Sequence, residues 1–244
     1  MKSDGAFAAA IVVAAGCGTR FGDPNKALFP LRGRPLIAYC LDALETAWCV
    51  HDIIVVAGEH TRDRVAKLVA AGDWTKITYL VIGGNRRQDS VVNGMRQVRA
   101  DREVVLLHDA ARPLARPSLF NQTATRARDV GAAIAAIPIT DTIKRVEGCS
   151  IQTTIARDGL WASQTPQAFQ RALLADALAS PTAQDLIYTD EAALLEALGV
   201  PVEVVLGSLA NFKLTREEDV PFIETLLAAA DREPIGDAPT AARA

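Results

Sequence analysis

The stretch Ala14-Ala15-Gly16-Cys17-Gly18-Thr19-Arg20-Phe21-Gly22 decides the fold class, because it follows the apolar run Ile11-Val12-Val13 without a break. An apolar run that leads into a glycine-rich turn is typical of a buried first strand in an α/β sheet, where ligands bind at the carboxyl ends of the strands. Glycines there let backbone N–H groups approach phosphate oxygens closely. The spacing is neither GxGxxG nor a Walker loop, because Phe21 replaces the third glycine and no GK[ST] follows.

The rest of the chain alternates short apolar runs with amphipathic stretches, which predicts βαβ units. Strands are expected at 7–14, 52–57, 77–82, 103–108, 131–137 and 202–206. Helices are expected over 61–71, 89–99, 117–129, 189–198 and 216–229, and one from Pro35 with an apolar face of Leu36, Ile37, Cys40, Leu41, Leu44 and Trp48. Since both faces of the strands are apolar, we predict an α/β fold with a doubly wound, mostly parallel sheet.

Two segments break this alternation. Residues 138–168 carry β-formers and turn signals but no helical period, so we expect an extended β arm that leaves the main body. A lone two-stranded ribbon is marginally stable, so the arm should pair with a second chain in a homodimer. Residues 231–244 are polar and contain proline, which predicts a frayed tail after a single domain over 1–230.

Composition excludes several classes of protein. Half of the 244 residues are hydrophobic, and the formal net charge of −3 argues against general nucleic-acid binding. No apolar run reaches the roughly 18 residues of a membrane span. The four cysteines form no CxxC pair, which favours reduced thiols and a cytoplasmic location. Lys2 and the run from Ala6 to Ala15 have some likeness to a secretory signal, but Asp4 interrupts the charged region and we prefer a buried strand.

Two cations accompany the first glycine-rich loop, Arg20 within it and Lys26 beyond it. A glycine-rich loop with flanking cations suits a triphosphate that is held while its α-phosphorus is attacked. Solvated surface charge is the alternative for either cation alone.

The second candidate site is the run from Leu106 to Pro113, at the end of the fourth predicted strand. Asp109 is well placed there to hold Mg²⁺ or a ribose hydroxyl, and Arg112 to clamp a phosphate with two hydrogen bonds. His108 stands at the edge of an apolar run. We expect it to pack or to form hydrogen bonds rather than to act as a base, because a phosphate nucleophile needs no deprotonation.

The third candidate is the loop from Gly83 to Ser90, where a glycine pair separates a strand from a helix. Such a loop binds anions or contacts a base. For Asp89 and Ser90, capping of the next helix is an equally good interpretation.

Together these motifs resemble the 2-C-methyl-D-erythritol 4-phosphate cytidylyltransferase family, from about residue 9 to residue 228. The resemblance is carried by AAGxGxR at 14–20 with Lys26, GGxxRxxS at 83–90, HDAARP at 108–113, DT at 141–142, RxGLW at 157–161, TPQ at 165–167, TDEA at 189–192 and NxKxT at 211–215. It implies a Rossmann-like nucleotidyltransferase that joins CTP to methylerythritol phosphate and releases pyrophosphate.

The resemblance also implies roles for single residues. Arg20 and Lys26 would be catalytic and would stabilise the pentavalent transition state, and Asp109 would face the ribose or magnesium-bound phosphates. The implied CTP-binding residues are Ala14, Ala15, Gly16, Gly18, Gly84, Asn85, Ser90, Asp109 and Ala110. The implied acceptor-binding residues are Arg112, Thr142, Arg157, Thr165, Thr189 and Lys213. Thr142 and Arg157 would act in the neighbouring subunit's site.

Two features depart from the family pattern or bear on the choice of substrate. Asn25-Lys26-Ala27 stands where the family often has Pro-Lys-Gln, and the loop reads AAG where ribitol-phosphate relatives have AGG. The second feature favours methylerythritol phosphate. The alternatives are an enzyme for ribitol 5-phosphate, an acid-sugar cytidylyltransferase and a non-catalytic nucleotide-binding protein. The presence of both Arg20 and Lys26 favours an enzyme.

Overall fold

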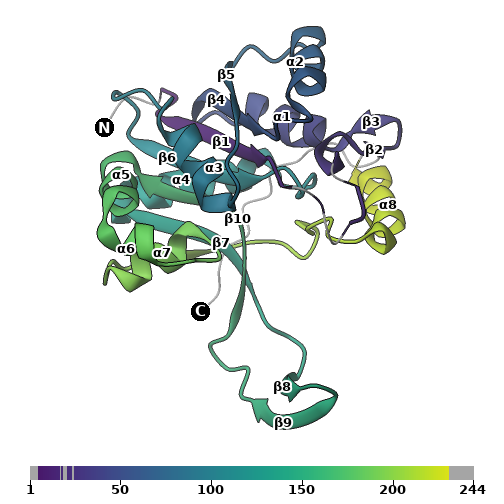
Figure 1. Ribbon diagram of the computed structural model, residues 1–244, viewed down its shortest axis with the longest axis vertical. Helices are drawn as coiled ribbons and strands as arrows, with labels where there is room; N and C mark the ends of the chain where they lie inside the picture. Colours follow the sequence, from purple (N-terminus) through teal and green to yellow (C-terminus); the bar gives the residue numbers. More distant parts are fainter. Residues whose placement is uncertain (1–4, 17, 19–20, 24, 231–244) are drawn as a thin grey trace.

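The computed structural model describes residues 5–16, 18, 21–23 and 25–230, and its centre is a seven-stranded sheet (Figure 1). In spatial order the strands are β11 (Glu203–Leu206), β7 (Ala132–Pro138), β10 (Trp161–Gln170), β6 (Val104–Asp109), β1 (Ala8–Ala14), β4 (Val50–Ala57) and β5 (Ile77–Ile82). Only β10 runs antiparallel to its neighbours in this sheet. The predicted mostly parallel sheet is therefore confirmed.

Helices cover both faces of the sheet, as a doubly wound fold requires. One face is covered by α1 (Leu36–Thr46), α2 (Arg62–Ala71) and α4 (Pro117–Val130). The other is covered by α3 (Arg87–Met95), α5 (Arg171–Ala179), α6 (Pro181–Asp185) and α7 (Glu191–Ala197).

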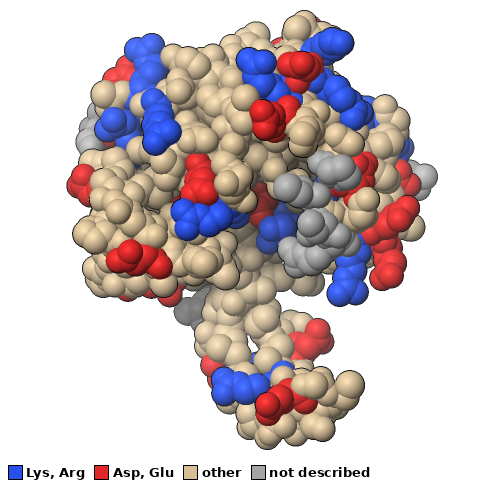
Figure 2. Space-filling model, viewed as in Figure 1, with Lys and Arg blue, Asp and Glu red and all other residues tan. Residues whose placement is uncertain are grey.

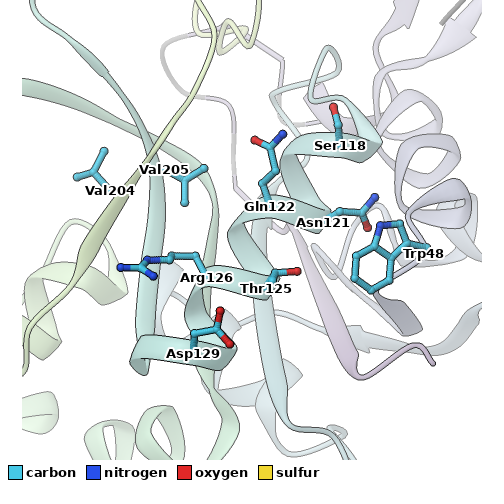
Figure 3. Close-up of a pocket in the computed structure, with 9 residues that line it drawn as sticks. All are labelled: Trp48, Ser118, Asn121, Gln122, Thr125, Arg126, Asp129, Val204 and Val205. Carbon is cyan, nitrogen blue, oxygen red and sulfur yellow. The ribbon is translucent and has the colours of Figure 1, made fainter. Parts of the chain in front are cut away.

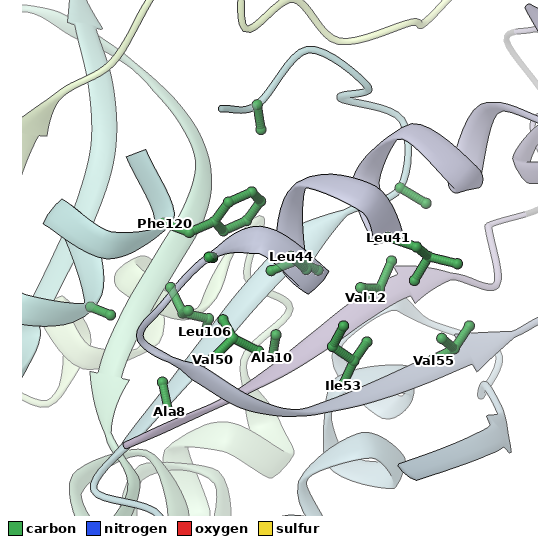
Figure 4. Close-up of a cluster of buried hydrophobic side chains, with 14 of the residues drawn as sticks. Ala8, Ala10, Val12, Leu41, Leu44, Val50, Ile53, Val55, Leu106 and Phe120 are labelled. Carbon is green, nitrogen blue, oxygen red and sulfur yellow. The ribbon is translucent and has the colours of Figure 1, made fainter. Parts of the chain in front are cut away.

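The central strand β1 shows why both faces must be covered. Ala8, Ala10 and Val12 pack with Leu41 and Leu44 of α1 on one face (Figure 4). The intervening residues of β1 pack on the opposite face, because successive side chains of a strand point to opposite sides. Because both sets are buried except for the partly buried Val13, β1 is a continuous apolar run, and the first glycine-rich loop follows directly from its end.

A third apolar cluster, beside the first glycine-rich loop, joins residues 21–36 to residues 214–227. Ile223 and Leu227 of α8 (Val220–Ala230) pack with Phe21, Leu36 and Leu214. The cluster also encloses the hairpin of β2 (Pro30–Leu31) and β3 (Arg34–Pro35). This packing brings residues near 214 against residues near 26.

Several boundaries differ from the sequence prediction. Helix α1 ends at Thr46, so Trp48 leaves the predicted apolar face and is 51% exposed. Helix α3 starts and ends earlier than 89–99, and the predicted helix 216–229 divides into a 3-10 turn, η2 (Glu217–Asp219), and α8. The prediction missed α5, α6, the β2–β3 hairpin and the 3-10 turn η1 (Lys26–Leu28) because they are short or border a strand directly.

The arm in the structure is shorter than the predicted range of 138–168. A hairpin of β8 (Ile143–Glu147) and β9 (Ser150–Ile155) projects from the body (Figure 1). From Trp161 onward the chain returns to the main sheet as β10, where residues 167–170 pair with β6. The TPQ motif thus lies in β10, where Thr165 and Gln167 are both buried. The predicted tail, 231–244, lies outside the described residues.

Within the described part of the chain, no helix combines the length and apolar character needed to cross a bilayer.

Candidate active site

The candidate site lies where the order of the strands reverses. From β1 the chain passes to β4 and β5 on one side and then to β6 on the other, so the loops after β1 and β6 separate at the carboxyl ends of the strands. Val13 is in register with Asp109, and the Ala110 N–H donates to the Val13 carbonyl at 3.1 Å. A cavity of about 530 Å³ opens at this edge.

The cavity collects most of the predicted nucleotide-binding residues. Predicted residues on its wall are Ala14, Ala15, Gly16, Gly18, Lys26, Gly84, Asn85, Ser90, Asp109, Ala110 and Lys213. On the face seen in Figure 2, basic and acidic side chains lie next to one another around a hollow in the main body. Arg20 lies outside the described residues.

Two glycines are required by close contacts in this wall. Gly18 has φ +56°, and a Cβ there would lie 2.1 Å from the Asp23 carbonyl oxygen. A Cβ on Gly83 would lie 2.3 Å from the Ala15 Cβ. The loop after β5 therefore packs on the loop after β1 through Gly83, and Gly18 allows the first loop to fold tightly on itself.

The loop after β5 is stiffened by its own polar side chains. The Ser90 hydroxyl accepts the Gly84 N–H at 3.1 Å and donates to the Arg86 carbonyl at 3.2 Å. The Asp89 carboxylate accepts the Arg86 backbone N–H at 3.1 Å, at the start of α3. Asp89 thus caps α3, which was one of its two predicted roles. Ser90 fixes the glycine pair by a hydrogen bond and also lines the cavity.

Asp109 is the centre of a buried charge network. Its carboxylate accepts from Lys213 Nζ at 2.5 Å and from Arg87 Nε at 3.3 Å. Arg87 Nη1 also donates to Glu191 Oε2 at 2.6 Å. Burial alone would raise the pKa of Asp109, but the adjacent Arg87 and Lys213 cations outweigh it and hold the pKa well below its usual value. Asp109 is therefore a carboxylate at neutral pH.

Lys26 reaches the same region from the start of η1. Its Nζ donates to the Leu214 carbonyl and lies 5.5 Å from the centre of the Phe21 ring. The Leu214 N–H donates to the Ala111 carbonyl at 2.8 Å. These bonds place Lys26 and Lys213, which are far apart in sequence, on one cavity wall.

His108 is a buried neutral imidazole, which confirms that it packs and forms hydrogen bonds. Its ring lies 4.9 Å from that of Phe120, and desolvation lowers its pKa to about 4. Nε2 faces the Arg112 carbonyl at 3.2 Å, and Nδ1 faces the Thr165 hydroxyl at 3.0 Å. Because a carbonyl only accepts, Nε2 carries the proton and Thr165 donates to Nδ1. The Thr165 hydroxyl in turn accepts the Asp109 N–H at 3.1 Å.

Arg112 braces the loop after β6 instead of lining the cavity. Its guanidinium donates to the carbonyls of Asn211 at 2.7 Å and Ser163 at 3.3 Å, and the residue is 9% exposed. Arg112 and Thr165 are therefore both buried beneath the site, where Thr165 supports Asp109.

The remaining predicted acceptor residues lie apart from the cavity wall. The projecting arm carries the β8–β9 hairpin (Figure 1). Thr142 and Arg157 flank this hairpin in sequence and are exposed, and Arg157 Nη1 donates to the Thr140 carbonyl. Thr189 is exposed and precedes Asp190, which caps α7 by accepting the Ala193 N–H at 3.0 Å. Of the predicted acceptor set, only Lys213 lines the cavity.

Sequence reasoning missed part of the wall. The missed residues include Gly58, Glu59, His60, Thr61, Arg87 and Thr215. The first four follow β4, so the rule that ligands bind at the carboxyl ends of strands could have found them. Arg87 and Thr215 stand in the GGxxRxxS and NxKxT motifs, but no role was predicted for either, because an arginine at the start of a helix is usually a solvated surface residue.

A second cavity, of about 560 Å³, lies between α4, Trp48 and β11 (Figure 3). Its arginine, Arg126, is paired with Glu203 at 2.5 Å. Among the described residues, neither glycine nor lysine lines it. Its lining does not suit a triphosphate, so we place the active site at the strand-order reversal.

The Rossmann-like sheet and the glycine-rich loop at its reversal point, with two lysines and a carboxylate, define the nucleotidyltransferase class. Residues 8–229 match the family model described as IspD, 2-C-methyl-D-erythritol 4-phosphate cytidylyltransferase. The chain belongs to this family.

Individual relatives agree with the family match. The chain is 43% identical to the 2-C-methyl-D-erythritol 4-phosphate cytidylyltransferase of Frankia casuarinae over 236 residues, 96% of this chain and 85% of the relative. It is 39% identical to the enzyme of the same name from Halalkalibacterium halodurans over 224 residues, 91% of this chain and 97% of the relative.

Solved structures show the same fold. The crystal structure of 4-diphosphocytidyl-2C-methyl-D-erythritol synthase from Anaerococcus prevotii matches with a TM-score of 0.80 at 31% identity, covering 92% of this chain and 97% of that one. The 2-C-methyl-D-erythritol 4-phosphate cytidylyltransferase from Thermus thermophilus matches with a TM-score of 0.75 at 29% identity, covering 90% of this chain and 98% of that one.

Proposed function

We propose that this protein transfers the cytidylyl group of CTP to 2-C-methyl-D-erythritol 4-phosphate, forming 4-diphosphocytidyl-2-C-methyl-D-erythritol and pyrophosphate. The observation that carries the proposal is the cavity at the strand-order reversal, where glycine-rich loops face Lys26, Lys213 and Asp109. The names of the relatives support the choice of both substrates.

The reaction is an in-line displacement. A phosphate oxygen of the acceptor attacks the α-phosphorus of CTP, the bond from that phosphorus to the bridging oxygen breaks, and pyrophosphate leaves with the electron pair. Both reactants are anions, so the site must offset their repulsion and the charge that grows on the equatorial oxygens. Lys26 and Lys213 supply fixed positive charge on the wall, and we assign the same catalytic role to Arg20.

The nucleotide would lie across the two glycine-rich loops. Backbone amides near Gly16 and Gly18 would hold phosphate oxygens, since a preorganised amide needs no reorientation during the reaction. The loop of Gly84 and Asn85, held by Ser90, would contact the cytosine. Ala14, Ala15 and Ala110 would provide a wall without bulky side chains.

A divalent cation fits the donors on this wall. Among the described residues, no group of three or more His, Cys, Asp or Glu is placed to hold a metal ion. Mg²⁺ in nucleotide sites is commonly held by one or two carboxylates, with phosphates and water as further ligands. Asp109 is an ionised carboxylate on the cavity wall and would hold the ion or the ribose. Mg²⁺, when bound, would neutralise charge on the phosphates.

The acceptor would bind between Lys213 and residues of a second subunit. Thr142 and Arg157 are exposed on the arm, so a homodimer would bring the partner's arm to this site. Thr189 would line its own subunit's side. Thr165 and Arg112 are buried beneath the site, so both would act on the acceptor indirectly, Thr165 by supporting Asp109 and Arg112 by bracing the loop. A cytoplasmic location stays a prediction.

Pyrophosphate release in a coupled assay tests the proposal. We expect release only when CTP, Mg²⁺ and methylerythritol phosphate are all present. Parallel assays with ribitol 5-phosphate and with an acid sugar as the acceptor test the sister activities. Faster turnover with either of these acceptors would reassign the substrate. CTP binding without pyrophosphate release from any acceptor would indicate a non-catalytic nucleotide-binding protein.

A further inference from the structure

Glu191 is a fully buried carboxylate behind the cavity wall. It is the first residue of α7 and its side chain is 0% exposed. Its Oε2 accepts from Arg87 Nη1 at 2.6 Å, while its Oε1 has no hydrogen-bond partner among the described residues. Burial raises the pKa of this carboxyl and the Arg87 guanidinium opposes that shift, so the charge of Glu191 depends on its one cationic partner.

Among the described side-chain hydrogen bonds and ion pairs, Glu191 contacts the site only through Arg87. Arg87 lines the cavity and Glu191 does not. The guanidinium is shared between two carboxylates, with Glu191 at 2.6 Å and Asp109 at 3.3 Å. The shorter contact indicates that Glu191 holds the larger part of the guanidinium's interaction.

We propose that Glu191 is a positioning residue, which draws Arg87 away from Asp109 and so keeps Asp109 available to a divalent cation. The inference rests on the proposed function, in which Asp109 holds the metal. Arg87 contacts Asp109 Oδ1 and Lys213 contacts Oδ2, so the Arg87 guanidinium and a metal ion compete for Oδ1. Glu191 weakens the guanidinium in this competition while preserving its place on the cavity wall.

The variant Glu191→Gln separates this role from packing. Glutamine has nearly the same shape, and its amide oxygen still accepts from Arg87, but it carries no charge. The guanidinium then interacts more strongly with Asp109 and competes better against the metal. The double variant Arg87→Gln/Glu191→Gln removes the competing cation and leaves two neutral amides that can bond to each other.

The measurement is Mn²⁺ binding to the complex of the full chain with CTP, without acceptor, followed by water-proton relaxation enhancement, which is large for Mn²⁺ on the protein and small for Mn²⁺ bound to free CTP. For Glu191→Gln we expect the Mn²⁺ dissociation constant to rise on the order of tenfold, as for residues that support a metal ligand. For the double variant we expect wild-type or tighter binding. Glu203→Gln is the matched control, because Glu203 also pairs with an arginine but lies on β11 and does not line the cavity. The Mn²⁺ dissociation constant of this variant should equal that of the wild type.

Each outcome decides the inference. Unchanged or tighter Mn²⁺ binding in Glu191→Gln overturns it, and so does a folded double variant that binds Mn²⁺ more weakly than wild type. The measurement on the double variant remains decisive even if Glu191→Gln does not fold. If the wild-type chain binds no Mn²⁺ with CTP, both this inference and the proposed metal site are rejected. If it binds Mn²⁺ but releases no pyrophosphate, only the proposed reaction is rejected.

Discussion

The active-site cavity and the projecting arm are held together in opposite ways. At the cavity, Asp109 is bonded to Lys213, Arg87 and Thr165, which come from three distant parts of the chain. In the arm, bonds are local, such as Lys144 Nζ to Thr154 Oγ1 at 2.6 Å across the hairpin. One half of the proposed site is thus fixed by long-range contacts, while the arm is held by local contacts, and we predict that it contacts a second chain.

The exposed apolar side chains of the arm support this difference. Val146 is 51% exposed and Ile151 is 64% exposed, although both lie in strands. A two-stranded hairpin with exposed apolar residues gains stability when a second surface covers it. The cavity half needs no such partner to keep its geometry.

The largest expected effect concerns the cations of the cavity half. Lys26→Ala and Lys213→Ala should each lower kcat about a hundred- to a thousandfold, because each removes positive charge that opposes phosphate repulsion in the transition state. Steady-state pyrophosphate release measures the effect. Lys67→Ala on α2 is the matched control and should behave as wild type. A near-normal kcat for either site variant would remove that lysine from the catalytic set.

A smaller effect concerns the pH dependence of stability in the cavity half. Burial lowers the pKa of His108 from the ordinary histidine value of 6.5 to about 4, so the unfolded chain binds the proton first as pH falls. The stabilising contribution is therefore complete above about pH 6.5 and is lost as pH falls toward 4, by about 3 kcal/mol in total.

Urea unfolding at stepped pH tests this contribution. Between pH 7 and pH 4 the wild-type free energy of unfolding should fall more steeply than that of His108→Gln, which has no titrating group at this position. Parallel curves for the two proteins would show that His108 titrates normally in the folded state.

Next in size is the support that Thr165 gives to Asp109. Thr165→Val keeps the shape but leaves the Asp109 N–H and His108 Nδ1 without their partner, which should cost about 1–3 kcal/mol of unfolding free energy. Thr165→Ser keeps the hydroxyl and should lose less. If valine and serine destabilise equally, the lost methyl packing rather than the hydrogen bonds explains the effect.

The smallest effect on stability is expected in the arm. The Ile139 N–H donates to the Leu160 carbonyl at 2.9 Å, so the arm can be replaced between these residues by an Asn-Gly turn. Unfolding free energy should change by no more than about 1 kcal/mol, since the arm's bonds are local. In sedimentation we expect a dimer for the full chain and a monomer for this variant. A large loss of stability would mean that the arm supports its own body.

These differences also explain what the sequence could predict. The alternation of apolar runs predicted the sheet, because each strand is buried on both faces as β1 is. Loops after β1 and β6 were predictable from their place at strand ends. The Arg87–Glu191 contact was not, because it joins residues 104 positions apart and depends on how α3 and α7 pack. Arg112 was misleading, since an arginine that braces carbonyls has the same sequence signal as one that binds phosphate.

The predicted end of the arm at residue 168 was wrong for a related reason. Residues 161–168 carry the polar and apolar pattern of a strand, and a pattern alone does not say which sheet the strand joins. Pairing of β10 between β7 and β6 is a long-range choice, fixed by Phe169, which is fully buried in the core.

Subunit mixing tests most directly whether the site combines one subunit's cavity with its partner's arm. Lys26→Ala removes the cavity contribution and Arg157→Ala the arm contribution, so each variant alone should be inactive. After random exchange of equal amounts, about half of the dimers are mixed, and each mixed dimer holds one intact site, so activity should return to about a quarter of wild type. No recovery despite demonstrated exchange would contradict the account and assign the arm to its own subunit.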